Sequence, residues 1–216
     1  MGLFAEKYAS QLTDVGFVPV VCFKNRKELD TFLEAVIPTP VRSIEITMRH
    51  AFTPEAIAYI KKNHPDFTVG AGTLNSFALM DTALDCGADF FVAPGYEETF
   101  VDYAAEKGVP YLPGCSTPSE ILHAYSKGFN VLKFFPAEAM GGTKVFKLYE
   151  GAFAGISFIP TGGITLNNFA DYAACKNITA CGGSFMVPKD MLQAGDSEGI
   201  NRTVEQCISS YKENRK

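Results

Sequence analysis

Residues 43–62 read SIEITMRHAFTPEAIAYIKK and contain a strand-like segment followed by a helix-like segment. In 43–47 isoleucine alternates with serine, glutamate and threonine, which is the two-residue period of a half-buried β-strand. Thr53 is followed by proline and glutamate, a helix-start pattern, and Ile57 and Ile60 then share one helical face. The stretch therefore predicts one β-strand joined to one helix.

The same pattern recurs along the chain, and the apolar runs begin roughly 20 to 26 residues apart, which leaves room for one strand, a turn and a three-turn helix. These runs are 17–23, 43–47, 67–71, 89–93, 109–112, 130–135, 156–160 and 178–181. Helix signals lie between them: Gly87 ends a helical period over 77–86, and Thr117-Pro-Ser-Glu120 forms a capping box. Further helices are expected at 4–14 and 197–213.

Eight strand–helix units predict an α/β fold: a single (β/α)8 TIM barrel with an additional N-terminal helix, in one domain over residues 1–216. An open doubly wound sheet is the competing architecture. That fold normally has a glycine-rich turn after the first strand, and 23–26 (Phe-Lys-Asn-Arg) has no glycine.

Composition narrows the class of protein. The 216 residues are 47% hydrophobic and 20% charged, with a net charge of −5, which disfavours a disordered chain, a collagen and a nucleic-acid partner. No apolar run approaches the roughly 18 to 20 residues of a membrane span. The N-terminus becomes charged too early for a signal peptide, so a cytoplasmic protein without a membrane partner is expected. The six cysteines include no C-x-x-C pair and no H-E-x-x-H occurs, which predicts no metal.

Lys133 is the first candidate catalytic residue, because it interrupts the apolar run Val131-Leu-Lys-Phe-Phe-Pro136. Strand alternation that points Lys133 into the barrel also points Val131 inward and sends Leu132 and Phe134 outward under the helices. Apolar walls solvate an ammonium poorly and favour the neutral, nucleophilic amine. A lysine at a strand end that reaches out to water is the alternative.

Glu45 is the second candidate, on the strand whose other face carries Ile44 and Ile46. With the apolar face packed on helices, Glu45 points into the barrel, where a carboxylate needs a partner. Its strand and that of Lys133 are four apart in a ring of eight, so the two side chains are expected to face each other. An amine and a carboxylate in one pocket suit Schiff-base chemistry, whereas a purely structural ion pair is the alternative.

Glycine pairs follow the last two predicted strands, in Pro160-Thr-Gly-Gly-Ile164 and Cys181-Gly-Gly-Ser-Phe185. Glycine lets backbone N–H groups approach an anion, and the loops after strands 7 and 8 of a barrel are a frequent phosphate site. These loops therefore predict a phosphate subsite, although glycine serves tight turns equally well.

The chain resembles the bacterial 2-keto-3-deoxy-6-phosphogluconate (KDPG) aldolases, which also act as 4-hydroxy-2-oxoglutarate aldolases. The resemblance covers nearly the whole chain in ordered motifs, which are Val18-Pro-Val-Val21, Ile44-Glu-Ile-Thr-Met-Arg49, Val69-Gly-Ala-Gly-Thr73, Ala93-Pro-Gly95, Pro113-Gly-Cys-Ser-Thr-Pro-Ser-Glu120, Lys133-Phe-Phe-Pro-Ala-Glu138, Pro160-Thr-Gly-Gly163 and Gly182-Gly-Ser184.

The resemblance implies a homotrimeric class I aldolase without metal or other cofactor, which cleaves a phosphorylated keto acid to pyruvate and D-glyceraldehyde 3-phosphate. It implies that Lys133 forms the Schiff base and that Glu45 is the general acid/base. The implied substrate-binding residues are Arg49 and Thr73 at the pyruvoyl carboxylate, Pro94 and Phe135 along the pocket, and Thr161, Gly162, Gly163 and Ser184 at the phosphate.

Two kinds of alternative remain: other main substrates for an aldolase, and other classes of protein on the same barrel. The sequence does not fix the stereochemistry at C4, so the galactonate epimer, or 4-hydroxy-2-oxoglutarate as main substrate, stays open beside the phosphogluconate. A phosphosugar isomerase would need no strand-buried lysine, and a non-catalytic sugar-phosphate-binding barrel would have no use for a Glu45–Lys133 pair.

Overall fold

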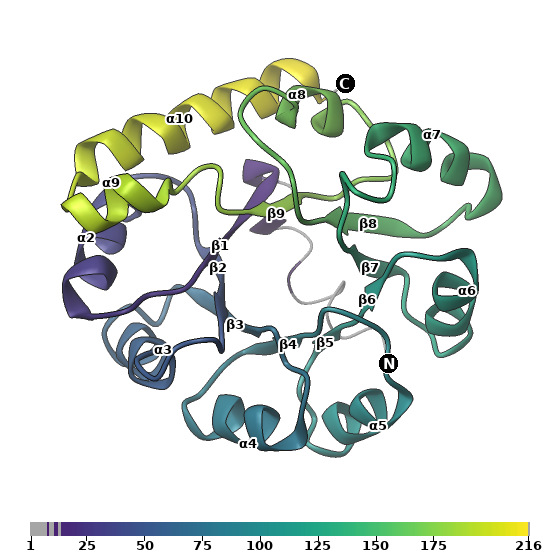
Figure 1. Cartoon of the computed structure of the whole chain (residues 1–216), viewed down its shortest axis with the longest axis horizontal. Helices are drawn as coiled ribbons and strands as arrows, with labels where there is room; N and C mark the ends of the chain where they lie inside the picture. The colour runs from purple at the N-terminus through teal and green to yellow at the C-terminus, as the bar shows by residue number, and fades with distance from the viewer. Residues whose placement is uncertain (1–7, 9–10, 13, 216) are drawn as a thin grey trace.

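The structure is a computed structural model that describes residues 8, 11–12 and 14–215. Its strands pair in parallel and form two curved sheets, one of order β5-β4-β3-β2-β1-β9 and one of order β6-β7-β8 (Figure 1). The strands are β1 (Phe17–Val21), β2 (Ser43–Thr47), β3 (Thr68–Gly72), β4 (Phe90–Val92), β5 (Tyr111–Leu112), β6 (Gly114–Cys115), β7 (Val131–Phe134), β8 (Ser157–Pro160) and β9 (Cys181–Gly183). The predicted α/β class with a parallel sheet is confirmed.

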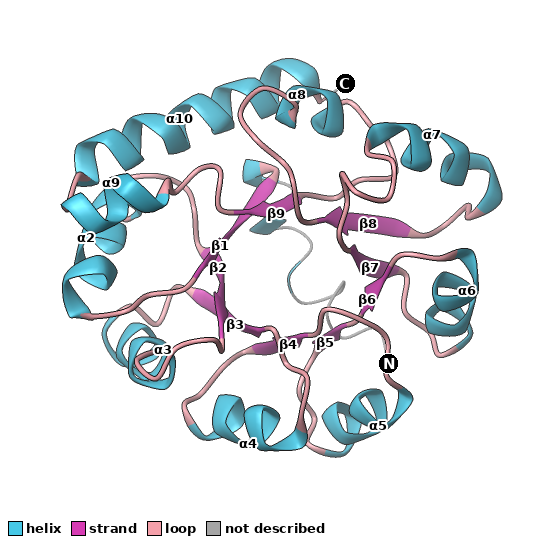
Figure 2. Ribbon diagram, viewed as in Figure 1, coloured by secondary structure: helices cyan, strands magenta, loops and turns pink. Residues whose placement is uncertain are grey.

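Helices alternate with the strands and lie outside them (Figure 2). They are α2 (Arg26–Val36), α3 (Thr53–Asn63), α4 (Phe77–Asp85), α5 (Glu98–Glu106), α6 (Pro118–Ser126), α7 (Thr143–Ala152), α8 (Phe169–Ala173), α9 (Lys189–Ala194) and α10 (Ser197–Asn214). None of these helices is both long and apolar enough to cross a bilayer. Most of the helix predicted at 4–14 falls outside the described residues.

Hydrogen bonds and bridges connect the two sheets at both junctions. On one side the Lys133 N–H on β7 donates to the Pro113 carbonyl, between β5 and β6, at 3.0 Å. On the other side, isolated parallel bridges join Phe158 to Ile178 and Thr161 to Gly182, which places β8 beside the segment that leads into β9. The carboxyl ends of the strands therefore gather around one interior.

Two predicted strands differ from the observed ones. The strand expected at 109–112 consists of β5 and β6 with Pro113 between them, because proline has no N–H to continue the ladder. The strand expected at 178–181 is β9 at Cys181–Gly183, since pairing with β1 begins at Phe17 opposite Cys181. That register depends on a partner far away in the sequence.

Alternation along the strands divides the apolar side chains into two clusters. Leu132 and Phe134 belong to the larger cluster, which packs against the helices, whereas Val131 belongs to the smaller one. This is the facing predicted for that strand. The smaller cluster, called the inner cluster below, contains Tyr8, Leu12, Val18, Phe90, Val92, Leu112, Val131, Ile159 and Ala180.

Candidate active site

The structure joins Glu45 of β2 and Lys133 of β7 in a buried ion pair. The Lys133 Nζ lies 3.1 Å from the Glu45 Oε1 and 3.4 Å from Oε2. Each residue is only 5% exposed, and the two come from different sheets. Burial of two charges is tolerated because each offsets the other, so the pair is mutually dependent.

Gly72, at the end of β3, makes room for the Glu45 carboxylate. Glu45 pairs with Gly70 in the β2–β3 ladder, and a Cβ on Gly72 would lie 2.2 Å from the Glu45 Oε1. Any side chain at position 72 would therefore displace the carboxylate. The absence of a side chain here fixes where the carboxylate lies relative to the amine.

Among the predicted binding residues, Phe135 lies close to this pair. The Phe135 ring centroid is 5.7 Å from the Lys133 Nζ, and the phenylalanine is 37% exposed. Thr73 follows Gly72 with φ of 62°, which is an uncommon and strained conformation for a β-branched residue. Pro94 follows β4 and packs by its backbone against Gly114, but no hydrogen bond or ring contact joins Thr73 or Pro94 to the pair.

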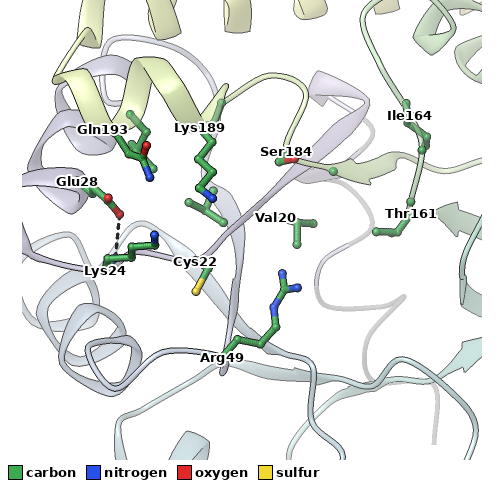
Figure 3. A pocket seen from close by; sticks show the side chains of 16 residues that line it. Val20, Cys22, Lys24, Glu28, Arg49, Thr161, Ile164, Ser184, Lys189 and Gln193 are labelled. Carbon is green, nitrogen blue, oxygen red and sulfur yellow. Dashed lines mark hydrogen bonds between the residues drawn. The ribbon is translucent and has the colours of Figure 1, made fainter.

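A cavity of about 480 Å³ opens beside the carboxyl ends of β1, β8 and β9 (Figure 3). It gathers five of the predicted binding residues, namely Arg49, Thr161, Gly162, Gly163 and Ser184. Lys133, Glu45, Phe135, Thr73 and Pro94 are not among its lining residues. Five of the predicted binding residues therefore line the cavity, whereas the buried pair lies outside its lining.

The loop of Gly162 and Gly163 presents an unpaired N–H group at Gly163. Both glycines have positive φ, 99° and 81°, which other residues rarely adopt. Their carbonyls accept hydrogen bonds from the Glu138 N–H and the Asn168 side chain, whereas the Gly163 N–H has no acceptor among the described residues. Glu138 also packs against Gly163 and accepts a hydrogen bond from the Tyr172 hydroxyl. This support holds the free Gly163 N–H in place.

Thr161 and Arg49 add side-chain donors to the cavity. Thr161 is only 7% exposed, and its Oγ1 has no hydrogen-bond partner within the described part of the chain. The Arg49 Nε donates to the Thr47 Oγ1 at 3.2 Å, and the guanidinium reaches into the cavity (Figure 3). A buried hydroxyl without a partner is uncommon and suits a site that a ligand completes.

Four polar residues that line this cavity are not predicted from the sequence: Lys24, Glu28, Lys189 and Gln193. Lys24 comes directly after the apolar run 17–23, so its place at the carboxyl end of a strand was a usable signal. Lys189 begins α9, and no periodicity in the sequence indicates which way its side chain points.

The arrangement supports carbonyl chemistry at the buried pair. An amine that packs beside a carboxylate in an apolar interior is placed to attack a ketone while the carboxylate moves protons. Within the described residues, no three His, Cys, Asp or Glu side chains form a group that could hold a metal ion.

Comparison with known proteins agrees with this chemistry. Residues 9–203 match the sequence profile of the KDPG and KHG aldolase family. The KHG/KDPG aldolase of Escherichia coli (strain K12) is 36% identical over 203 residues, which cover 94% of this chain and 95% of that protein.

Two solved structures superpose with a TM-score of 0.86. One is a KDPG aldolase from Legionella pneumophila with pyruvate captured as a covalent carbinolamine intermediate, 27% identical and covering 94% of this chain and 97% of that one. The other is a KDPG aldolase of Zymomonas mobilis ZM4 with 3-phosphoglycerate, 28% identical and covering 94% and 96%. By sequence and by fold, this chain belongs to the KDPG and KHG aldolase family.

Proposed function

We propose that the protein is a class I aldolase that cleaves 2-dehydro-3-deoxy-6-phosphogluconate to pyruvate and D-glyceraldehyde 3-phosphate. The observation that carries this proposal is the buried Lys133–Glu45 pair at 3.1 Å. Family membership supports the same reaction, as does the covalent pyruvate carbinolamine in the Legionella relative.

The proposed reaction begins when Lys133 passes its proton to Glu45 and attacks the C2 ketone as the free amine. Glu45 relays protons while the carbinolamine loses water and becomes an iminium. Glu45 then takes the proton of the C4 hydroxyl, the C3–C4 bond breaks, and its electron pair flows into the iminium. The aldehyde leaves, and protonation and hydrolysis of the remaining enamine release pyruvate and free Lys133.

The binding roles are those that the resemblance implies. Arg49 and Thr73 hold the pyruvoyl carboxylate, and Pro94 and Phe135 line the path of the carbon chain. At the phosphate, the proposed contacts come from Thr161, Gly162, Gly163 and Ser184. The unpaired Gly163 N–H and the unpaired Thr161 hydroxyl support this assignment.

Four further features complete the proposal. The chain is a single domain over 1–216 whose two sheets close into a (β/α)8 barrel, for which the bridges between β8 and the β9 segment are the support. The resemblance supports a homotrimer, which sedimentation in solution tests. The reaction needs no metal or other cofactor, so activity is expected to survive prolonged treatment with EDTA. A phosphorylated metabolite as substrate fits a cytoplasmic location.

Borohydride reduction in the presence of pyruvate tests the function. Reduction should fix pyruvate on the protein irreversibly, and peptide mapping should place it on Lys133. The expected product assay is release of pyruvate from the phosphorylated substrate. An isomerase or a non-catalytic binding barrel would form no adduct, and an adduct on another lysine would overturn the assigned nucleophile.

A further inference from the structure

Two lysines form a wall of the cavity that the family pattern does not assign. Lys24 lies between β1 and α2, and Lys189 is the first residue of α9. In Figure 3 the amino ends of both side chains are directed into the space that Ser184 and Thr161 also border. The cavity therefore has side-chain cations in addition to the glycine loop.

These cations have no ion-pair partner among the described residues. Neither lysine, nor Arg49 in the same lining, forms an ion pair with any described residue. The lining contains one carboxylate, Glu28, which is 5% exposed and accepts a hydrogen bond from the Lys24 backbone N–H at 2.8 Å. Three unpaired cations against one engaged carboxylate give the cavity a positive potential in a chain of net charge −5.

A second observation points to a ligand at this place. The Thr161 Oγ1 is buried without a partner, and the Gly163 N–H lacks an acceptor among the described residues. These neutral donors and the two lysines line the same cavity. An anion between them would accept hydrogen bonds from the loop and charge-assisted ones from the lysines.

We propose that Lys189, with Lys24 beside it, is a specificity-determining residue that binds the terminal phosphate of the substrate. This inference rests on the proposed aldolase function. It commits the chain to a keto acid with a terminal dianionic phosphate in preference to 4-hydroxy-2-oxoglutarate, whose distal group is a single carboxylate.

The test compares two substrates in one variant. Lys189→Ala should lower kcat/KM for the phosphorylated substrate by about 10- to 100-fold, the worth of a charge-assisted hydrogen bond. For 4-hydroxy-2-oxoglutarate the change should stay within about two-fold, because that substrate lacks the phosphate. Lys189→Arg should restore most of the loss, and Lys24→Ala should show the same selectivity to a smaller extent.

Lys212→Ala, which removes an exposed lysine from α10, is the matched control and should leave both substrates unaffected. Equal losses on both substrates, or no loss, would overturn the assignment of Lys189. Trapping with pyruvate and borohydride distinguishes a failure of the proposed function from a failure of the role assigned to Lys189. If the wild-type protein forms no adduct, the proposed function fails; if it does and Lys189→Ala is unselective, only this inference fails.

Discussion

At the scale of single residues, Gly72 controls the position of the Glu45 carboxylate. A Cβ at Gly72 would lie 2.2 Å from the Glu45 Oε1, and nothing in the β3 backbone conformation disfavours alanine itself. Gly72→Ala should therefore leave the fold intact, move Glu45 and lower kcat by up to roughly 10²- to 10⁴-fold, the usual worth of a placed acid/base. Steady-state kinetics beside a thermal unfolding curve measure both effects.

Gly151→Ala provides the control for that variant. Gly151 lies in α7, and a Cβ there would meet nothing within 4 Å. The activity of the Gly151→Ala variant should therefore match that of the wild type. Full activity in Gly72→Ala would show that the observed position of Glu45 is not needed for turnover.

The Lys133–Glu45 pair also makes a prediction about stability. Lys133→Met leaves the Glu45 carboxylate buried without a partner and should lower the free energy of unfolding by about 3–5 kcal/mol. The double variant Lys133→Met/Glu45→Gln removes both charges and should recover most of that loss. Urea unfolding of the wild type, the single variants Lys133→Met and Glu45→Gln, and the double variant measures the coupling. Simple additivity of the two single losses would contradict a coupled buried pair.

Which site residues could be predicted depends on where they lie. Glu45 and Lys133 sit inside strands, where the two-residue period determines which face each side chain takes, and the predicted meeting of the two is what the structure shows. Lys24 and Lys189 are exposed and lie at or between element ends, where no period fixes direction. Their convergence arises from tertiary structure, so the sequence alone could not reveal it.

At the scale of elements, the α6 capping box is a local device with a pH-dependent part. The Glu120 Oε2 accepts hydrogen bonds from the Ser116 and Thr117 N–H groups, both at 2.8 Å, and Thr117 caps the Glu120 N–H in return. Burial alone would raise the pKa of Glu120, but these hydrogen bonds outweigh it and hold the pKa below its usual 4.5.

Glu120→Gln should therefore destabilise the protein only above the acid range. A lowered folded-state pKa gives a contribution that is fully present above about pH 4.5 and is lost as the pH falls through the folded value. Thr117→Ala should cost about 1 kcal/mol at every pH, since its hydroxyl does not titrate. Thermal unfolding across a pH series measures both. A Glu120→Gln difference that stayed constant in acid would contradict this account.

Elements were predictable where their signals are local. The capping box at 117–120 and the glycine after α4 lie within a few residues of the helix ends that they mark, and both helix ends are where the sequence predicts them. The start of β9 follows from its pairing with β1, more than 160 positions earlier in the chain by residue number, so local pattern misplaced it. Non-local register is the information that a strand's own residues lack.

At the scale of the whole molecule, burial makes most of the cysteines inert. Desolvation raises the pKa of Cys86 to about 11 and those of Cys115 and Cys207 to about 12, and it also raises the pKa values of Cys175 and Cys181. Cys22 is half-buried and lines the cavity. The thiolate is the reactive form, so the accessible cavity cysteine should react first.

Thiol labelling of the native protein at mildly alkaline pH tests this order. We expect Cys22 to be modified before the other five cysteines, and inorganic phosphate or the phosphorylated substrate to slow its labelling by occupying the same cavity. Labelled peptides identified by mass spectrometry give the order. Faster labelling of any other cysteine, or no protection by phosphate, would contradict the expectation.

The two ends of the interior differ in their residues: the inner cluster fills one end, and the buried pair and the cavity lie toward the other. On β7 the inward face passes from Val131 in that cluster to Lys133 in the buried pair, and on β1 it passes from Val18 in the cluster to Val20 in the cavity wall. The end filled by the inner cluster thus stabilises the fold, and the opposite end carries the proposed catalytic and binding residues. Substitutions in the loops and side chains at the end with the pair and the cavity leave the apolar packing at the other end unchanged. A few mutations are therefore enough to change the substrate preference while the chain stays folded.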